Sequence, residues 1–104
     1  MTLEQFRRSL ALASAPPGAS NALRAMWEDA KGSWSAAHAI AQEIDDSTGS
    51  WIHAYLHRKE GDLENAGYWY RRARQPIAHD TLDEEWERIV LTLLRSGDAI
   101  LDDK

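Results

Sequence analysis

Turn-forming residues break this chain at short intervals. Pro16-Pro17-Gly18 forms the first break, and single glycines follow at Gly32 and Gly61. Proline has no backbone N–H to donate and glycine tolerates positive φ, so each of these positions favours the end of a helix. Between the breaks, apolar residues recur at helical spacing, and no segment alternates in the manner of a strand. The pattern predicts an all-α protein of about six helices joined by short turns.

Capping residues mark where the helices are expected to begin. Thr2 with Gln5 and Thr81 with Glu84 have the form of capping boxes. Three further N-cap candidates follow turns: Ser20, Ser33 and Asp62. The segment from Asp45 to Gly49 is expected to be a loop. The predicted organisation is a single domain over residues 1–104, with a cap helix at 2–14, helix pairs at 20–44 and 50–75, and a cap helix at 81–101.

The two predicted helix pairs are similar to each other. Residues 21–44 align without gaps on residues 50–73, and the small residues coincide as Ala25 with Ala54, Gly32 with Gly61, and Ala37 with Ala66. Alanine lets neighbouring helices approach closely, and glycine followed by a capping residue supplies the turn between them. A third turn of this kind, Gly97-Asp98, follows the last helix and predicts a repeat that ends halfway.

The second pair resembles a known repeat. Residues 61–66, GDLENA, followed by Tyr70, Ala73 and Pro76, resemble the second half of a tetratricopeptide repeat. Residues 22–76 as a whole resemble a family of small bacterial tetratricopeptide-like proteins. The resemblance implies a right-handed stack of antiparallel helix pairs, and it implies no activity. In ordinary repeats of this kind the first helix would bury the positions of His53, Ala54 and His57.

Periodicity within residues 50–60 favours a different buried face. Trp51, Ile52, Tyr55 and Leu56 cover one arc of the helix, and the two histidines lie on the opposite arc with Glu60. In the repeat alignment these histidines fall on polar residues of the first pair. We therefore expect a polar strip that binds a protein or peptide partner, made of Arg24, Glu28, His53, His57, Arg58 and Glu60.

The same face supports an alternative interpretation. Histidines four positions apart on a helix offer two imidazole nitrogens to one metal ion, and Glu60 lies one turn further on. A further ligand has to come from another helix, and His38 and Glu28 are the candidates. Zinc and nickel suit such ligands. The alternative is thus a metal- or small-ligand-binding protein, or an enzyme, centred on His53, His57 and Glu60. If the face binds no ligand, these residues only form hydrogen bonds on a polar surface.

The segment YWYRRAR, residues 68–74, combines aromatic residues with arginines. Trp69, Tyr70 and Ala73 share a stripe that predicts packing in the core, and the remaining tyrosine and the arginines are expected in solvent. Such a surface is compatible with single-stranded nucleic acid, but the net charge of −5 disfavours that partner. All five tryptophans are predicted to pack in the core, and an exposed one would indicate a homodimer.

Composition narrows the functional classes. The chain has no cysteine, so it carries no disulfide, thiolate metal site or cysteine nucleophile, and this fits a cytoplasmic protein. It has no phosphate-binding glycine loop and no nucleophile elbow. An apolar run near residue 10 is too interrupted for an export signal, and no membrane span is expected. The leading prediction is a non-catalytic protein-interaction or scaffold module without a cofactor.

Overall fold

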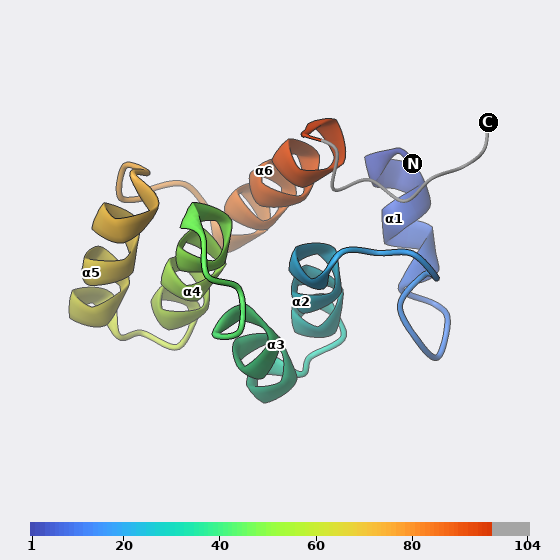
Figure 1. The fold of residues 1–104 in the computed structure, drawn as a ribbon, viewed down its shortest axis with the longest axis horizontal. Coiled ribbons are helices and arrows are strands. Elements are labelled where there is room, and N and C mark those ends of the chain that lie inside the picture. Colours follow the sequence, from blue (N-terminus) through green and yellow to red (C-terminus); the bar gives the residue numbers. More distant parts are fainter. Residues whose placement is uncertain (97–104) are drawn as a thin grey trace.

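The computed structural model describes residues 1–96, and within that range the chain forms six α-helices and no strand (Figure 1). The helices are α1 (Leu3–Ser9), α2 (Asn21–Ala30), α3 (Trp34–Ala41), α4 (Ser47–Lys59), α5 (Leu63–Ala73) and α6 (Leu82–Arg95). The predicted all-α class and the number of helices are confirmed. The Gly97-Asp98 turn and the last part of the helix predicted at 81–101 lie outside the described residues.

Most helices begin at the capping residue that the sequence indicates. Both capping boxes form, at Thr2 and at Thr81, and Asp62 accepts a hydrogen bond from the Asn65 amide at the start of α5. The prediction was wrong at α4, which begins three residues early because Asp46 caps it by accepting from the Gly49 amide. Gly49 is therefore in the first turn of the helix and not in the loop. Ser33 precedes α3 but makes no side-chain capping bond.

The first helix is shorter than the predicted 2–14, because other contacts take over after Ser9. The Ser9 hydroxyl donates to the Phe6 carbonyl and accepts the Trp27 indole N–H at 3.1 Å. The Lys31 ammonium group, which comes from the end of α2, donates to the carbonyls of Leu10 and Leu12 at 2.7 and 3.1 Å. These bonds hold residues 10–12 as a turn against α2, so that the helix does not continue.

Two helical hairpins lie side by side, with α6 across them. The pairs α2–α3 and α4–α5 make the most extensive contacts, and their turns use Gly32 and Gly61 at φ of 90° and 92°. Helix α6 packs on both α2 and α4, and α1 packs on α6. In Figure 1, α5 and α1 occupy opposite ends of a molecule that measures 41 × 25 × 24 Å. Helix α4 lies in the middle and contacts every other helix except α1.

The central position of α4 overturns the expected polar face. The stripe of Trp51, Ile52, Tyr55 and Leu56 is buried as predicted, but His53 and His57 are buried as well, at 7% and 8% exposed. The helical wheel separates two arcs of one helix, but it does not count the neighbouring helices. Because α2 and α6 contact α4, and α3 and α5 contact it too, both arcs are covered. All residues of α4 from Gly49 to His57 are therefore buried.

Two carboxylates are buried beside α4, and both are fully partnered. The Glu85 side chain, 0% exposed, accepts hydrogen bonds from Arg58 Nη1 at 2.8 Å, from the Tyr70 hydroxyl at 2.7 Å and from the Trp51 indole at 3.3 Å. Burial and this carboxylate raise the pKa of Tyr70, so its hydroxyl keeps the proton that it donates. A buried charge is costly unless it is paired and hydrogen-bonded, and here the bonds join α4, α5 and α6.

The second buried carboxylate, Asp29, joins α2 to α4. It accepts from the Tyr55 hydroxyl at 2.8 Å and from the Lys59 ammonium group at 2.9 Å. Both partners come from α4, so this pair fixes how far α4 is shifted along α2.

Among the described helices, none combines the length and the apolar character needed to cross a lipid bilayer.

Candidate metal centre

Three of the four histidines of the chain meet between α3 and α4. His38 comes from α3, and His53 and His57 come from successive turns of α4. One ring nitrogen from each lies within 4.8 Å of the other two, and the Nε2 atoms of His38 and His53 are 2.9 Å apart. The His53 and His57 rings are nearly parallel, at 12°, and the His38 ring stands across both, at 78° and 76°. We call these three residues the histidine cluster.

Small residues on α3 explain how this helix comes close enough to α4 for the three imidazoles to meet. Ala37 and Ala41 are almost completely buried on α3, and their small side chains leave room for the imidazoles of α4. Trp34 fixes the other end of α3 by donating its indole N–H to the Leu56 carbonyl at 2.8 Å. The same indole lies parallel to the His38 ring, with centroids 4.9 Å apart. The orientation of His38 is thus set by its own helix and by α4 together.

Two residues orient the histidines of α4. The indole of Trp69, from α5, stacks on His53 with centroids 4.0 Å apart. Glu60 lies one turn beyond His57, and its Oε2 is 2.7 Å from His57 Nδ1. When Nδ1–H donates to this carboxylate, the lone pair is left on Nε2, to which the Asn65 amide makes a long contact of 3.5 Å. A carboxylate behind a histidine is a frequent second partner of metal-binding imidazoles.

Two of the three imidazoles, those of His38 and His53, favour the uncharged state. Burial, followed by the charges of His38 and His57, lowers the pKa of His53 from 6.5 to about 4. Burial and His57 also lower the pKa of His38. A neutral imidazole carries the lone pair that a metal ion requires, whereas an imidazolium repels the ion. At neutral pH His38 and His53 are therefore uncharged. One of them donates an Nε2–H across their 2.9 Å contact, and that proton has to move to Nδ1 before both Nε2 atoms can bind an ion.

The spacing of the His38 and His53 nitrogens is close to that of two ligands in a metal site, and the His57 nitrogen lies within 4.8 Å of both. Zinc lies about 2.0–2.1 Å from histidine nitrogen in a tetrahedral site, which places two ligand nitrogens about 3.3 Å apart. The His38 and His53 nitrogens need to separate by only a few tenths of an ångström to reach that distance. An ion held by three imidazole nitrogens keeps a fourth position that can hold a water molecule or a small ligand.

The residues predicted for the polar strip do not form one surface. His53 and His57 are buried in the cluster, and Arg58 is bonded to Glu85. Arg24 is exposed and bonds Asn21 on its own helix, and Glu60 is exposed beside His57. Of the two candidates for the additional metal ligand, the structure brings His38 to the α4 histidines. Glu28 belongs to no group of candidate metal ligands within residues 1–96.

Sequence reasoning missed the role of two tryptophans. Trp27, Trp51 and Trp86 are buried in the core as predicted. Trp34 and Trp69 are only partly buried, and each lies flat against a histidine of the cluster. Their positions on α3 and α5, at the same helical phase as core residues, gave no sign that their neighbours would be imidazoles. Leu63, the first residue of α5, is 68% exposed.

The chain was compared with protein-family models, with curated proteins and with solved structures, and no match was found. The resemblance to tetratricopeptide-like proteins therefore stays a prediction carried by residues 22–76. The described architecture is that of an all-α protein with two packed helical hairpins.

Proposed function

We propose that this protein binds a divalent transition-metal ion, zinc foremost, through His38, His53 and His57. The observation that supports the proposal is the convergence of three ring nitrogens from two helices at a buried point, with His38 and His53 2.9 Å apart. Glu60 supports it further, because its carboxylate orients His57 from behind. Imidazole ligands suit zinc, nickel and copper. The chain has no cysteine, so a structural zinc site made of thiolates is excluded.

The test is zinc titration of the purified, chelator-treated protein by calorimetry, repeated with cobalt as a spectroscopic probe. We expect one ion per chain and a visible cobalt spectrum typical of low coordination number. His38 is the best residue to change, because it is only partly buried and lies at the edge of the core. His38→Ala is expected to weaken zinc binding by about 100-fold or more.

The chain provides its own control. His79 is the remaining histidine; it is exposed and does not belong to the cluster. His79→Ala is expected to bind zinc as the native protein does. Equal zinc affinity in the His38→Ala and His79→Ala variants would overturn the proposal, and so would a native protein that binds zinc no more tightly than millimolar. Circular dichroism of each variant separates loss of a ligand from loss of the fold.

The protein-interaction module predicted from the sequence stays a prediction. The burial of His53 and His57 removes them from any contact surface of the folded protein. Arg24 and Glu60 remain exposed, and charge reversal at these two positions is the direct test of that earlier hypothesis.

A further inference from the structure

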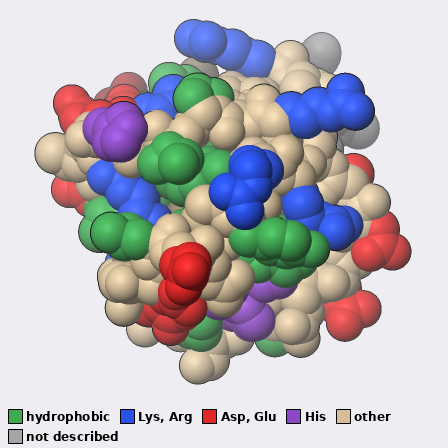
Figure 2. Space-filling view, turned by 90° about the vertical axis from the view of Figure 1, so that its left-hand side faces the viewer, with side chains coloured by type: hydrophobic (Ala, Val, Ile, Leu, Met, Phe, Trp, Pro, Cys, Tyr) green, Lys and Arg blue, Asp and Glu red, His purple; other side chains and the backbone are tan. Residues whose placement is uncertain are grey.

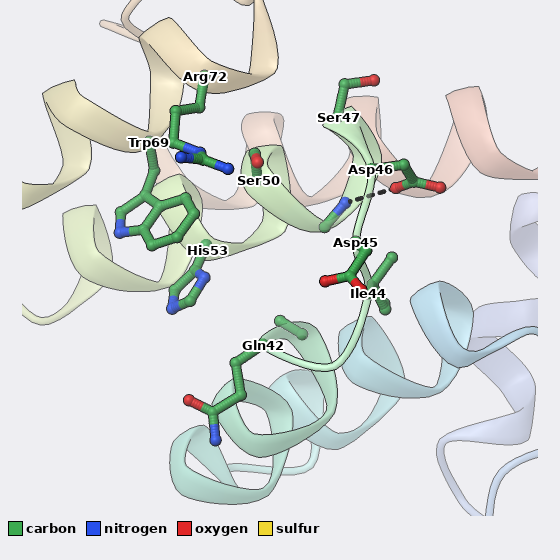
Figure 3. A pocket seen from close by; sticks show the side chains of 11 residues that line it. Gln42, Ile44, Asp45, Asp46, Ser47, Ser50, His53, Trp69 and Arg72 are labelled. Atoms are coloured by element: carbon green, nitrogen blue, oxygen red, sulfur yellow. Dashed lines mark hydrogen bonds between the residues drawn. The ribbon is translucent and has the colours of Figure 1, made fainter.

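A cavity of about 700 Å³ opens beside the histidine cluster (Figure 3). Its walls come from three helices and a loop: His53 and Ser50 from α4, Trp69 and Arg72 from α5, Ala41 from the end of α3, and Asp45 from the loop before α4. Its volume lies within the range of about 300–1,000 Å³ that is typical of small-molecule sites. The side chains that face it are mostly polar.

One wall of the cavity carries a cation without a carboxylate partner. The Arg72 guanidinium makes no ion pair with any acidic side chain of residues 1–96. It is held by the Tyr68 hydroxyl at 3.2 Å and lies over the Trp69 ring at 5.3 Å from its centroid. Figure 2 views this end of the molecule, where basic and apolar side chains are interleaved. Arg72 is an exposed side chain that leans on these two rings, and no carboxylate neutralises its charge within residues 1–96.

A serine side chain lines the same cavity as this cation. Ser50 is 8% exposed, lines the cavity, and its side chain makes no hydrogen bond to the described part of the chain. In Figure 3 the Ser50 hydroxyl and the Arg72 guanidinium both appear above His53, and both residues line the cavity. The Ser50 oxygen can be reached from the cavity, so a water molecule or a ligand atom can be its hydrogen-bond partner.

The opposite wall of the cavity carries a negative charge. Asp45 has no hydrogen bond or ion pair within residues 1–96, and Figure 3 shows its carboxylate directed towards the cavity. The neighbouring Asp46 is directed away and caps α4 through the Gly49 amide. The cavity thus presents one free cation and one free anion from opposite sides. A simple anion would be attracted by Arg72 but repelled by Asp45. A simple cation would be attracted by Asp45 but repelled by Arg72.

We propose that this cavity binds a small zwitterion, such as a free amino acid, whose carboxylate is held by Arg72 and Ser50 and whose ammonium group is held by Asp45. Arginine binds a carboxylate through two parallel hydrogen bonds, and the serine hydroxyl adds a third donor. The inference does not depend on the metal centre, although His53 borders both. Its test is accordingly made in the presence of a chelator and again with zinc.

The probes are γ-aminobutyrate and glycine, as a longer and a shorter zwitterion, with butyrate and butylamine as analogues of single charge. Binding is followed by calorimetry and by the shift of the Trp69 indole resonance in NMR spectra. We expect at least one zwitterion to bind about tenfold more tightly than either analogue. Equal binding of zwitterion and analogues, or no binding of any probe, would overturn the proposal.

Two variants assign the charges. Arg72→Gln is expected to abolish the advantage of the zwitterion over butylamine, and Asp45→Asn its advantage over butyrate. Arg71→Gln and Glu43→Gln are the matched controls, because both side chains are exposed neighbours that do not line the cavity. Neither control is expected to change the binding. If the Arg72 and Asp45 variants bind the zwitterion like the native protein, the assignment is wrong.

The comparison with and without zinc separates this inference from the proposed function. Zwitterion binding in the chelated protein supports the cavity assignment whether or not zinc binds. Binding that occurs only with zinc would place the carboxylate on the metal and would overturn the role given to Arg72. Zinc binding without any zwitterion binding would leave the metal centre intact and remove the cavity ligand.

Discussion

The indole of Trp69 lies flat on the imidazole of His53, with ring centroids 4.0 Å apart and an angle of 15° between the planes. The two residues come from the two helices of one hairpin, α5 and α4. The contact covers one face of His53 and restricts rotation of its ring, while His38 faces its Nε2 atom. Trp69 is therefore a positioning residue for the proposed metal centre rather than a ligand.

Replacing Trp69 by leucine is expected to lower zinc affinity about tenfold without changing the stoichiometry, because the ligands remain but His53 loses its orientation. Calorimetric titration gives both quantities. Tyr68→Leu is the control, since Tyr68 is exposed on the same helix, meets only the edge of the Trp69 ring and makes no ring contact with a histidine within residues 1–96. A stability loss with unchanged zinc affinity would show that Trp69 only packs.

The metal-free protein is expected to lose stability as the pH falls from about 6.5 to about 4. The folded-state pKa of His53 is lowered to about 4, so the unfolded chain takes up a proton first. Stability is therefore full above pH 6.5 and declines below it, by at most roughly 3 kcal/mol for this residue. His38, whose pKa is also lowered, acts in the same direction.

Urea unfolding in the presence of a chelator, repeated across this pH range, measures the effect. His38, His57 and Trp69 surround His53, and Arg72, Asp45 and Asp46 border the same cavity. Within residues 1–96 the His53 ring is hydrogen-bonded to His38 and to no carboxylate. The His53→Asn variant is expected to show a flatter profile, whereas His79→Asn is expected to follow the native one. An unchanged slope in His53→Asn would assign the pH dependence to other groups.

Replacing Glu85 by leucine is expected to destabilise the protein by about 3–5 kcal/mol, because Arg58 would keep a partly buried charge without its main partner. Thermal and urea unfolding measure the loss. Glu87→Gln serves as the comparison: its contact with Arg7 is 3.8 Å long and nearly half exposed, so a change within about 0.5 kcal/mol is expected. Similar effects of the two substitutions would contradict a structural role for the Glu85 network.

Two glycine-to-alanine substitutions in helices are expected to have opposite signs. A Cβ on Gly49 would lie 2.2 Å from the Ile44 carbonyl oxygen, so Gly49→Ala must displace the start of α4 and should cost about 2 kcal/mol or more. A Cβ on Gly67 meets only the flexible end of Arg71 at 3.7 Å, and Gly67→Ala should stabilise α5 by about 0.5–1 kcal/mol. The free energies of unfolding of both variants check this pair.

Local signals predicted the helices well, because caps and turns depend on neighbours in the chain. Thr2, Ser20, Asp62 and Thr81 all accept the capping bond expected of them. The start of α4 was misplaced because several residues before Ser50 can cap a helix, and the bond to Gly49 favours Asp46. Which of several adjacent caps is used depends on where the helix packs.

The candidate site was predictable only in part. The sequence placed His53 and His57 on one face and named His38 among the candidate partners, because the spacing of four residues is a local property. It did not predict that this face would be buried, since that depends on α3 and α5 closing over α4. The burial observed at His53, Ala54 and His57 is the one that the repeat resemblance implied, while the stacking of the repeats stays a prediction.

The central position of α4 ties the core and the candidate site to a single register. Along this one helix, Trp51 and Tyr55 meet Glu85 and Asp29 on one side, and His53 and His57 meet His38 on the other. A slip of α4 by one residue would break all of these pairings together, so neither side can drift while the other is held. An ion bound by the histidines would thereby act as a clamp on the alignment of the whole helical assembly.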